Sequence, residues 1–293
     1  MTDQVEDENI EGEEAEGEDE EEDEDPLAHL PEQVVQRVEK LRYLNDQRLD
    51  IMQEYLKERA ELEQKYLKTL KPLYDERASI LKGDQDETIA AAAEQRQNDS
   101  ENADESRERI VGIPHFWVTV MSEEETIGEQ LTEPDVDCLA TLENIEYEDF
   151  ADGKGFVLFF HFAENDYFHD KVLVKKYEVP NLLLSDEPML KNVEGCKIQW
   201  KEGKCLTHRT VKKKQRGKGK NAGQVRTITK EEKIDSFFNW FDPPPMPKMN
   251  EVDEAEADEL EEFFDSDYEI AQAFRSNVIP QAVMWFTGEV IVI

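Results

Sequence analysis

Cysteine is scarce in this chain of 293 residues, which contains only Cys138, Cys196 and Cys205. An odd and sparse set of cysteines argues against a scaffold held together by disulfides. The N-terminus carries neither the basic segment nor the apolar segment of a secretion signal. No apolar run approaches the ~20 residues that a membrane-spanning helix needs. These absences predict a soluble, intracellular protein.

Recognisable catalytic and metal-binding patterns are also missing. Cys196, Cys205 and His208 lack the short paired spacing of a zinc site. The segment Gly217–Lys220 is only a fragment of a phosphate-binding loop. Asp265–Glu269 begins like a calcium loop, but the glycine of the turn and the final glutamate are absent. The sequence therefore predicts no enzyme activity, no cofactor and no metal.

Negative charge, in contrast, is abundant. Asp and Glu together number 71 against 34 Lys and Arg, which gives a formal net charge of −37. A hydrophobic share of 38% and an aromatic share of 9% still allow a core, which a purely disordered acidic chain would lack. Such a charge repels nucleic acid and anionic membranes and attracts basic proteins. We expect basic protein partners, with neither membrane binding nor sequence-specific DNA binding; the alternative is that the charge only maintains solubility.

The N-terminal third divides by charge into three parts. Residues 1–29 are predicted to be a disordered acidic tail, because Met1–Asp25 contains no Lys or Arg. In residues 30–83 charges balance and apolar residues recur mostly three or four apart, or at multiples of that spacing, which predicts a long helix. Pro72 should kink this helix or end it early. Residues 84–110 are polar and are interpreted as an insertion or linker.

The apolar stripe of the predicted helix needs a partner. Some fifty residues at a rise of ~1.5 Å would form a rod of ~75 Å. An apolar face left in water over that length would aggregate, so we predict that the helix pairs with a second copy of the chain. Packing on its own domain alone is the alternative. The stripe consists of Val34, Val38, Leu41, Leu44, Met52, Leu56, Tyr66 and Leu70.

Residues 111–289 are predicted to form one folded domain that contains an antiparallel sheet. Gly155–Phe162 is apolar on both faces, as in a covered central strand. Cys196–Lys201 alternates polar and apolar residues, and Leu206–Val211 is expected to pair back on it across a turn. Glu251–Asp267 interleaves acidic and apolar residues and is interpreted as an amphipathic helix.

A basic island interrupts this acidic domain. It could bind nucleic acid, but it lacks interleaved aromatic residues for base stacking. It could protect a sheet edge from aggregation, or it could be a nuclear import signal. We favour the import signal, presented on a projecting hairpin at about residues 210–228. The basic residues concerned are Lys212, Lys213, Lys214, Arg216, Lys218 and Lys220.

Several motifs in a fixed order resemble the nucleosome assembly protein family, and together they extend over nearly all of residues 30–289. They are Leu62–Tyr66, Pro72–Tyr74, Gly112–Val120, Gly155–Phe162, Asn165–Phe168, Gly195–Lys204, Asp235–Pro244, Asp267–Ile270 and Ile279–Glu289. The resemblance implies an α+β fold. A long dimerisation helix, with a proline inside it, would precede an α/β domain whose antiparallel four-stranded sheet is backed by helices.

The resemblance also implies a function. A member of this family would be an ATP-independent histone chaperone, a homodimer without an active site. It would bind core histones through acidic surfaces, shield them from non-specific DNA contact, and assist nucleosome assembly and histone import. It would also bind a nuclear import receptor and shuttle between nucleus and cytoplasm. Residues 290–293 are apolar where members usually continue into a long acidic tail, so we expect a short C-terminus without that tail.

Candidate histone contacts are acidic residues of the folded domain, any of which could instead be solvated surface. They are Glu133, Asp135, Asp137, Glu143, Glu146, Glu148, Asp149, Asp258, Glu259, Glu261 and Glu262. The alternative function is an acidic scaffold or inhibitor protein that regulates a phosphatase or transcription.

Overall fold

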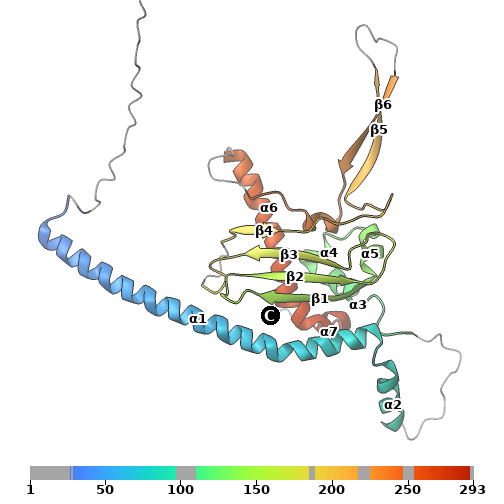
Figure 1. Ribbon diagram of the computed structural model, residues 1–293, viewed down its shortest axis with the longest axis horizontal. Coiled ribbons are helices and arrows are strands. Elements are labelled where there is room, and N and C mark those ends of the chain that lie inside the picture. Colours follow the sequence, from blue (N-terminus) through green and yellow to red (C-terminus); the bar gives the residue numbers. More distant parts are fainter. Residues whose placement is uncertain are drawn as a thin grey trace, which may run out of the picture. The chain divides into compact units, whose positions relative to one another are not determined.

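The computed structural model describes residues 27, 29–96, 110–184, 189–216, 225–246 and 254–290 (Figure 1). The chain divides into two units, Met1–Gln53 and Glu54–Ile293, and the boundary falls inside the first helix. Among the helices of the described ranges, none is both long and apolar enough to cross a membrane.

The first helix, α1, runs from Glu32 to Lys82. An acidic residue in its first turn and a basic residue in its last turn both suit the helix dipole. Gly83 stops the helix in the left-handed region, with φ of +87°. Its N–H donates to the carbonyl of Ile80 at 3.0 Å, and the N–H of Asp84 donates to that of Ser79 at 3.0 Å. This is the hydrogen-bond pattern of a Schellman cap, and it satisfies carbonyls that the helix end would leave free.

Pro72 does not end α1, although the sequence allowed that outcome. Contacts on both sides of the proline hold the helix to the folded domain. Before it, Gln64 Nε2 donates to the carbonyl of Asp149 at 2.8 Å. After it, Arg77 Nη1 donates to the carbonyl of Ile279 at 2.6 Å. These contacts offset the hydrogen bond that a proline removes from a helix interior.

A four-stranded antiparallel sheet follows, with strands in the order β1-β2-β3-β4. The strands are β1 (Leu142–Asp149), β2 (Gly155–Phe162), β3 (Val172–Glu178) and β4 (Asn192–Glu194). The predicted fold class, a long helix followed by such a sheet and helices, is confirmed.

The sheet buries one face more completely than the other. Alternate residues of β2 from Phe156 to Phe162 are buried, while the three residues between them are only half-buried. The expectation that this strand is fully covered on both faces was therefore half right. The strand is apolar except for His161, but helices pack tightly on only one side of it.

Helices and aromatic residues form the core on the buried face. Phe160 lies 5.2 Å from Phe241 and 5.0 Å from Phe274, measured between ring centroids, and both contacts are edge-to-face. Figure 1 shows the last helices passing across this face. The helical elements after α1 are α2 (Asp86–Arg96), α3 (Phe116–Glu123), α4 (Glu125–Gly128), α5 (Glu133–Leu139), the 3-10 helix η2 (Phe237–Phe241), α6 (Glu254–Gln272), the π-helix η3 (Ala273–Val278) and α7 (Ile279–Thr287).

The segment Cys196–Lys201 does not form the predicted strand of a hairpin. Its only strand-like pairing in the described residues is one bridge between Trp200 and Phe168. The N–H of Cys196 instead donates to the carbonyl of Phe241 at 3.0 Å. Alternation indicated correctly that one side of the segment is apolar, but the backbone bonds go to η2 and to the segment around Phe168.

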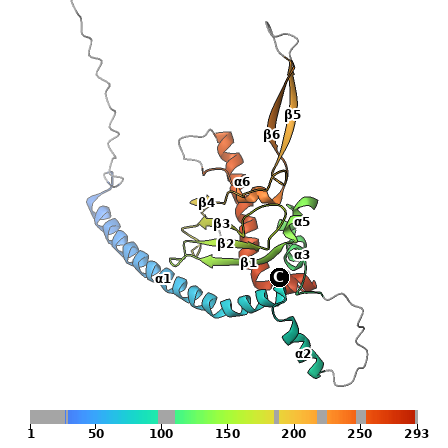
Figure 2. The same ribbon diagram turned by 45° about the vertical axis from the view of Figure 1, so that its right-hand side comes forward.

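A separate two-stranded sheet carries the basic island. Strands β5 (His208–Arg216) and β6 (Val225–Lys233) pair antiparallel, with His208 opposite Lys233 and Arg216 opposite Val225. Both views draw this hairpin extending from the four-stranded sheet (Figures 1 and 2).

Candidate functional site

The predicted acidic contacts fall on α5, β1 and α6. On α5, Glu133 and Asp137 are exposed, but Asp135 is completely buried. One carboxylate oxygen of Asp135 accepts hydrogen bonds from the N–H of Thr132 at 3.0 Å and the N–H of Phe237 at 2.8 Å. The prediction of Asp135 as an accessible contact is therefore wrong, because its carboxylate caps α5 and ties this helix to η2. Threonine followed three residues later by an acidic residue is the sequence signal of this cap.

On β1, two of the predicted contacts already have partners on α1. Glu143 lies 2.8 Å from the ammonium of Lys82, and Glu146 lies 3.8 Å from that of Lys71. Glu148 is exposed. The two paired carboxylates join β1 to α1, so an incoming cation would have to compete with a lysine of this chain.

Asp149, at the end of β1, is more tightly engaged. Arg275 of η3 donates to its two carboxylate oxygens at 2.8 and 2.9 Å. Burial lowers the pKa of Arg275, but the hydrogen bonds and charge of Asp149 outweigh burial and leave that pKa above its usual range. The guanidinium also lies 5.6 Å from the ring of Tyr147 and 5.3 Å from that of Phe156. This bidentate pair fixes the π-helix against the sheet. Asp149 therefore has a structural role, and its carboxylate is not available to bind a histone.

The acidic residues of α6 are the most accessible group. Asp258, Glu259, Glu261 and Glu262 are all exposed. On the other side of the helix, Phe264 and Tyr268 are buried in the core. The amphipathic helix predicted from Glu251–Asp267 thus presents carboxylates outward.

A buried ion pair holds α6 in place. The ammonium of Lys175 on β3 lies 2.5 Å from Asp267 of α6 and also donates to the carbonyl of Trp240. Tyr177 donates its hydroxyl to the same carboxylate at 2.6 Å. Burial, which outweighs the charge of Asp267, lowers the pKa of Lys175 to about 8, and burial raises the pKa of Asp267.

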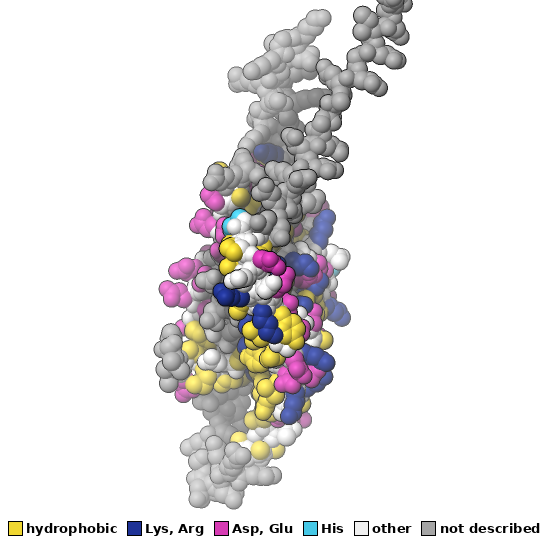
Figure 3. Space-filling view, turned by 90° about the vertical axis from the view of Figure 1, so that its left-hand side faces the viewer, with side chains coloured by type: hydrophobic (Ala, Val, Ile, Leu, Met, Phe, Trp, Pro, Cys, Tyr) yellow, Lys and Arg dark blue, Asp and Glu magenta, His cyan; other side chains and the backbone are white. Residues whose placement is uncertain are grey.

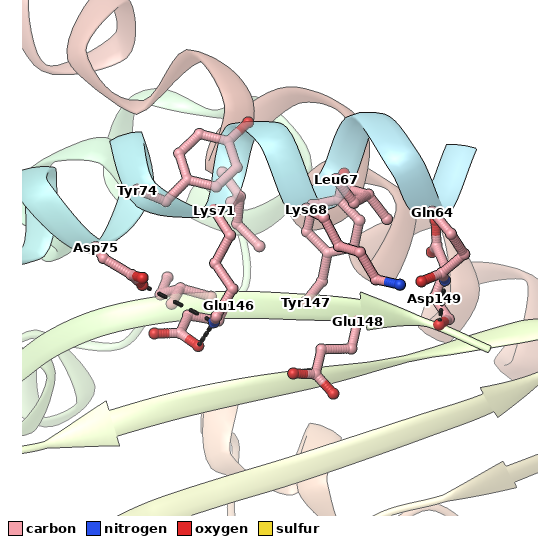
Figure 4. A pocket seen from close by; sticks show the side chains of 12 residues that line it. Gln64, Leu67, Lys68, Lys71, Tyr74, Asp75, Glu146, Tyr147, Glu148 and Asp149 are labelled. Atoms are coloured by element: carbon pink, nitrogen blue, oxygen red, sulfur yellow. Dashed lines mark hydrogen bonds and ion pairs between the residues drawn. The ribbon is translucent and has the colours of Figure 1, made fainter. Parts of the chain in front are cut away.

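A cavity of about 330 Å³ lies between the second half of α1 and β1 (Figure 4). Tyr74 and Tyr147 line it with Lys71 and Glu146, whose side chains point toward each other. Lys71 pairs with both Asp75 and Glu146 at 3.8 Å, and no nucleophile stands beside a base among the residues that line the cavity.

A larger hollow of about 700 Å³ lies at the root of the β5–β6 hairpin and contains two of the cysteines. Cys205 Sγ lies 3.4 Å from Thr207 Oγ1, which lies 3.0 Å from Nδ1 of His208. Burial raises the pKa of the Cys196 thiol. Within the described ranges, no group of three or more His, Cys, Asp and Glu side chains is placed to hold a metal ion.

The predicted dimerisation stripe is largely uncovered along α1. Leu41 and Tyr66 are 63% and 58% exposed, and Leu44 and Leu70 are exposed as well. The remaining members are half-buried: Val34, Val38, Met52 and Leu56. Hydrophobic side chains also reach the surface, between acidic and basic ones, on the face that Figure 3 shows.

The basic island lies mainly on β5. Lys212 is exposed, and Lys213, Lys214 and Arg216 follow it in the same strand. The remaining two predicted import residues, Lys218 and Lys220, fall outside the described residues.

Comparison of the amino-acid sequence with known proteins finds a matching family model and several relatives. A family model described as "Nucleosome assembly protein (NAP)" matches residues 36–289. Nucleosome assembly protein 1;3 of Nicotiana tabacum is 40% identical over 268 residues, which cover 90% of this chain and 68% of that protein. The Arabidopsis thaliana protein of the same name is 38% identical over 269 residues, covering 91% of this chain and 69% of that protein.

Solved structures show the same fold. Nucleosome Assembly Protein 1 from Plasmodium knowlesi aligns with a TM-score of 0.60 at 24% identity, covering 89% of this chain and 99% of that one. A second structure, of the malaria parasite Nucleosome Assembly Protein, aligns with a TM-score of 0.57 at 23% identity, covering 89% and 100%.

Proposed function

Because this chain belongs to the nucleosome assembly protein family, we propose that it is a histone chaperone that binds core histones and assists nucleosome assembly. The observation that carries the proposal is the set of exposed carboxylates on a folded domain within a chain of net charge −37. Histones bind DNA strongly and indiscriminately through its phosphates. An acidic surface that occupies the basic groups of histones shields the histones from non-specific contact with DNA. It releases them when DNA offers the ordered contacts of a nucleosome.

The exposed acidic residues are the proposed histone contacts. They are Glu133, Asp137, Glu148, Asp258, Glu259, Glu261 and Glu262. Glu143, Glu146 and Asp149 contribute less, because each already pairs with a basic residue of this chain. The chaperone works without ATP and without an active site. Transfer of histones to DNA needs only that the acidic chain and DNA compete for the same basic groups.

The proposed assembly is a homodimer that forms through α1. Leu41 and Tyr66 expose more than half of their side chains. Covering the exposed part of such a side chain stabilises a complex by ~1–2 kcal/mol before entropic costs. A second α1 supplies a matching apolar stripe.

The basic hairpin is the proposed signal for a nuclear import receptor, so that the protein shuttles between cytoplasm and nucleus. Each strand of the hairpin has nine residues, which span ~30 Å at ~3.3 Å per residue. The screening length at physiological ionic strength is only ~8 Å. Lys212 lies only two residues along β5 from Thr210, which faces Glu231, so acidic residues partly neutralise its charge. The backbone of Arg216 lies six residues, or ~20 Å, from that position, so the charge at this end of the hairpin is not neutralised by them.

The test is retention of purified core histones by the immobilised chain in the presence of competing DNA. A second small basic protein, hen lysozyme, is the control for charge alone. We expect histones to be retained at about 150 mM salt, where screening is already strong, and lysozyme to be lost. Equal retention of both proteins would support a general acidic scaffold instead. Loss of both proteins to the DNA would contradict chaperone function.

A further inference from the structure

A groove of about 430 Å³ separates α6 from η2. Phe237 and Trp240 of η2 line it and are almost completely buried. On the α6 side, Phe263 is 38% exposed, and Glu259 and Glu262 stand beside it. An aromatic interior thus meets two exposed carboxylates spaced three residues apart, which places them on the same side of the helix.

The two walls of this groove are held together from beneath. Lys175 donates both to the carbonyl of Trp240 on η2 and to the carboxylate of Asp267 on α6. The indole N–H of Trp240 also donates to the carbonyl of Asp267 at 3.1 Å. The groove is therefore preorganised, so a ligand that enters it does not bear the cost of ordering its walls.

The groove carries net negative charge at its rim. Asp267 is paired internally with Lys175, so it adds little to the field at the opening. Lys233 contributes one positive charge from the η2 side, against the two carboxylates of Glu259 and Glu262. A cationic side chain fits the α6 side of the groove, and an aliphatic side chain or the stem of a lysine fits the aromatic interior.

We propose that this groove binds a short basic segment of a partner protein in which an apolar residue stands next to a lysine or arginine. The apolar side chain packs on Phe263 and Trp240, and the cation reaches Glu259 or Glu262. The proposal rests on the histone-binding function proposed above, and it names the kind of segment that one part of the acidic surface selects.

The test measures fluorescence anisotropy of two labelled peptides with the full chain. One peptide is Gly-Lys-Leu-Lys-Leu-Gly and the other is Gly-Lys-Gly-Lys-Gly-Gly, which has the same charge but no apolar side chain. We expect the first to bind about fivefold more tightly, as partial burial of one leucine predicts. Equal affinity would mean that the chain recognises only the charge of the two peptides, which would overturn the proposal.

Matched variants locate the binding. Glu259→Gln with Glu262→Gln should weaken the leucine-containing peptide about fivefold, as two partly exposed ion pairs predict. The control is Asp265→Asn with Glu269→Gln, which removes the same charge from exposed residues of α6 that neither line the groove nor belong to the proposed histone contacts. We expect less than about a twofold change there. Equal losses in the two double variants would overturn the proposal.

A third variant tests the aromatic contact. Phe263→Ser should abolish the preference for the leucine-containing peptide, and Val283→Ser, at a 51% exposed residue of α7, should leave it intact. Core histones are measured in parallel with every variant. If the unaltered chain fails to bind histones, the proposed function fails. If it binds histones but the groove variants bind the leucine peptide normally, only the groove proposal fails.

Discussion

The buried ion pair beneath α6 gives the sharpest test of how the acidic helix is held. Replacing Lys175 by methionine keeps most of the side-chain volume but removes the ammonium. Asp267 then remains in the core at 3% exposure with its charge uncompensated. Removing one partner of a buried pair typically costs ~3–5 kcal/mol, and we expect a loss of unfolding free energy in this range.

The double variant Lys175→Met with Asp267→Leu should recover much of this loss. It leaves no buried charge, and its remaining defects are the carbonyl of Trp240 without a donor and the hydroxyl of Tyr177 without its carboxylate acceptor. We expect the cost of the double variant to be smaller than the sum of the two single costs by at least ~2 kcal/mol.

The assay is urea unfolding followed by tryptophan fluorescence, at one protein concentration for all variants because association shifts apparent stability. Additive single costs, or a cost below about 1 kcal/mol for Lys175→Met, would refute the reasoning. A value this small is typical of exposed pairs, and it would mean that the ammonium reaches water.

Three further predictions concern the dimer, the hairpin and the cysteines. The chain should sediment as a dimer at low micromolar concentration, and Leu41→Asp with Leu56→Asp should aggregate or unfold; a clean monomer of the unaltered chain would end the dimer model. Alanine at the basic residues within 212–216 should retain a fluorescent fusion in the cytoplasm while histone affinity changes little; unaltered nuclear entry would favour sheet-edge protection. Burial raises the pKa of Cys138 to about 12, so maleimide at pH 8 should modify half-buried Cys205 first and Cys138 only in denaturant; equal rates would contradict this.

Periodic features could be predicted from the sequence alone. The helical spacing of apolar residues predicted α1, and the compact apolar run of Gly155–Phe162 predicted a strand of the sheet. These patterns are local, and each follows from how a regular element presents its side chains. Whether the helix continues through Pro72 could not be predicted in the same way. Tertiary contacts that hold the helix on both sides of the proline decide this.

Pairings between distant residues could not be predicted. Composition marks Asp135 as one acidic residue among many, but its carboxylate is buried because Phe237 of η2 and Ser236 just before it, about a hundred residues later, donate hydrogen bonds to it. Lys175 did leave a signal, because it alternates with Leu173 and Tyr177 on the buried face of β3. A lysine at such a position must find a buried anion, although the strand alone does not identify Asp267 as that anion.

The most direct test of the central claim is histone transfer to DNA without nucleotide. Core histones are mixed with plasmid DNA at about 150 mM salt, where direct mixing favours non-specific aggregates, with and without the chain lacking residues 1–25. After nuclease digestion, we expect protected fragments of ~147 bp only when the chain is present. That result would show that the folded acidic surface is sufficient for the activity. If the truncated chain gives the same precipitate as histones and DNA alone, while the full chain gives protected fragments, the acidic tail and not the folded surface is the chaperone.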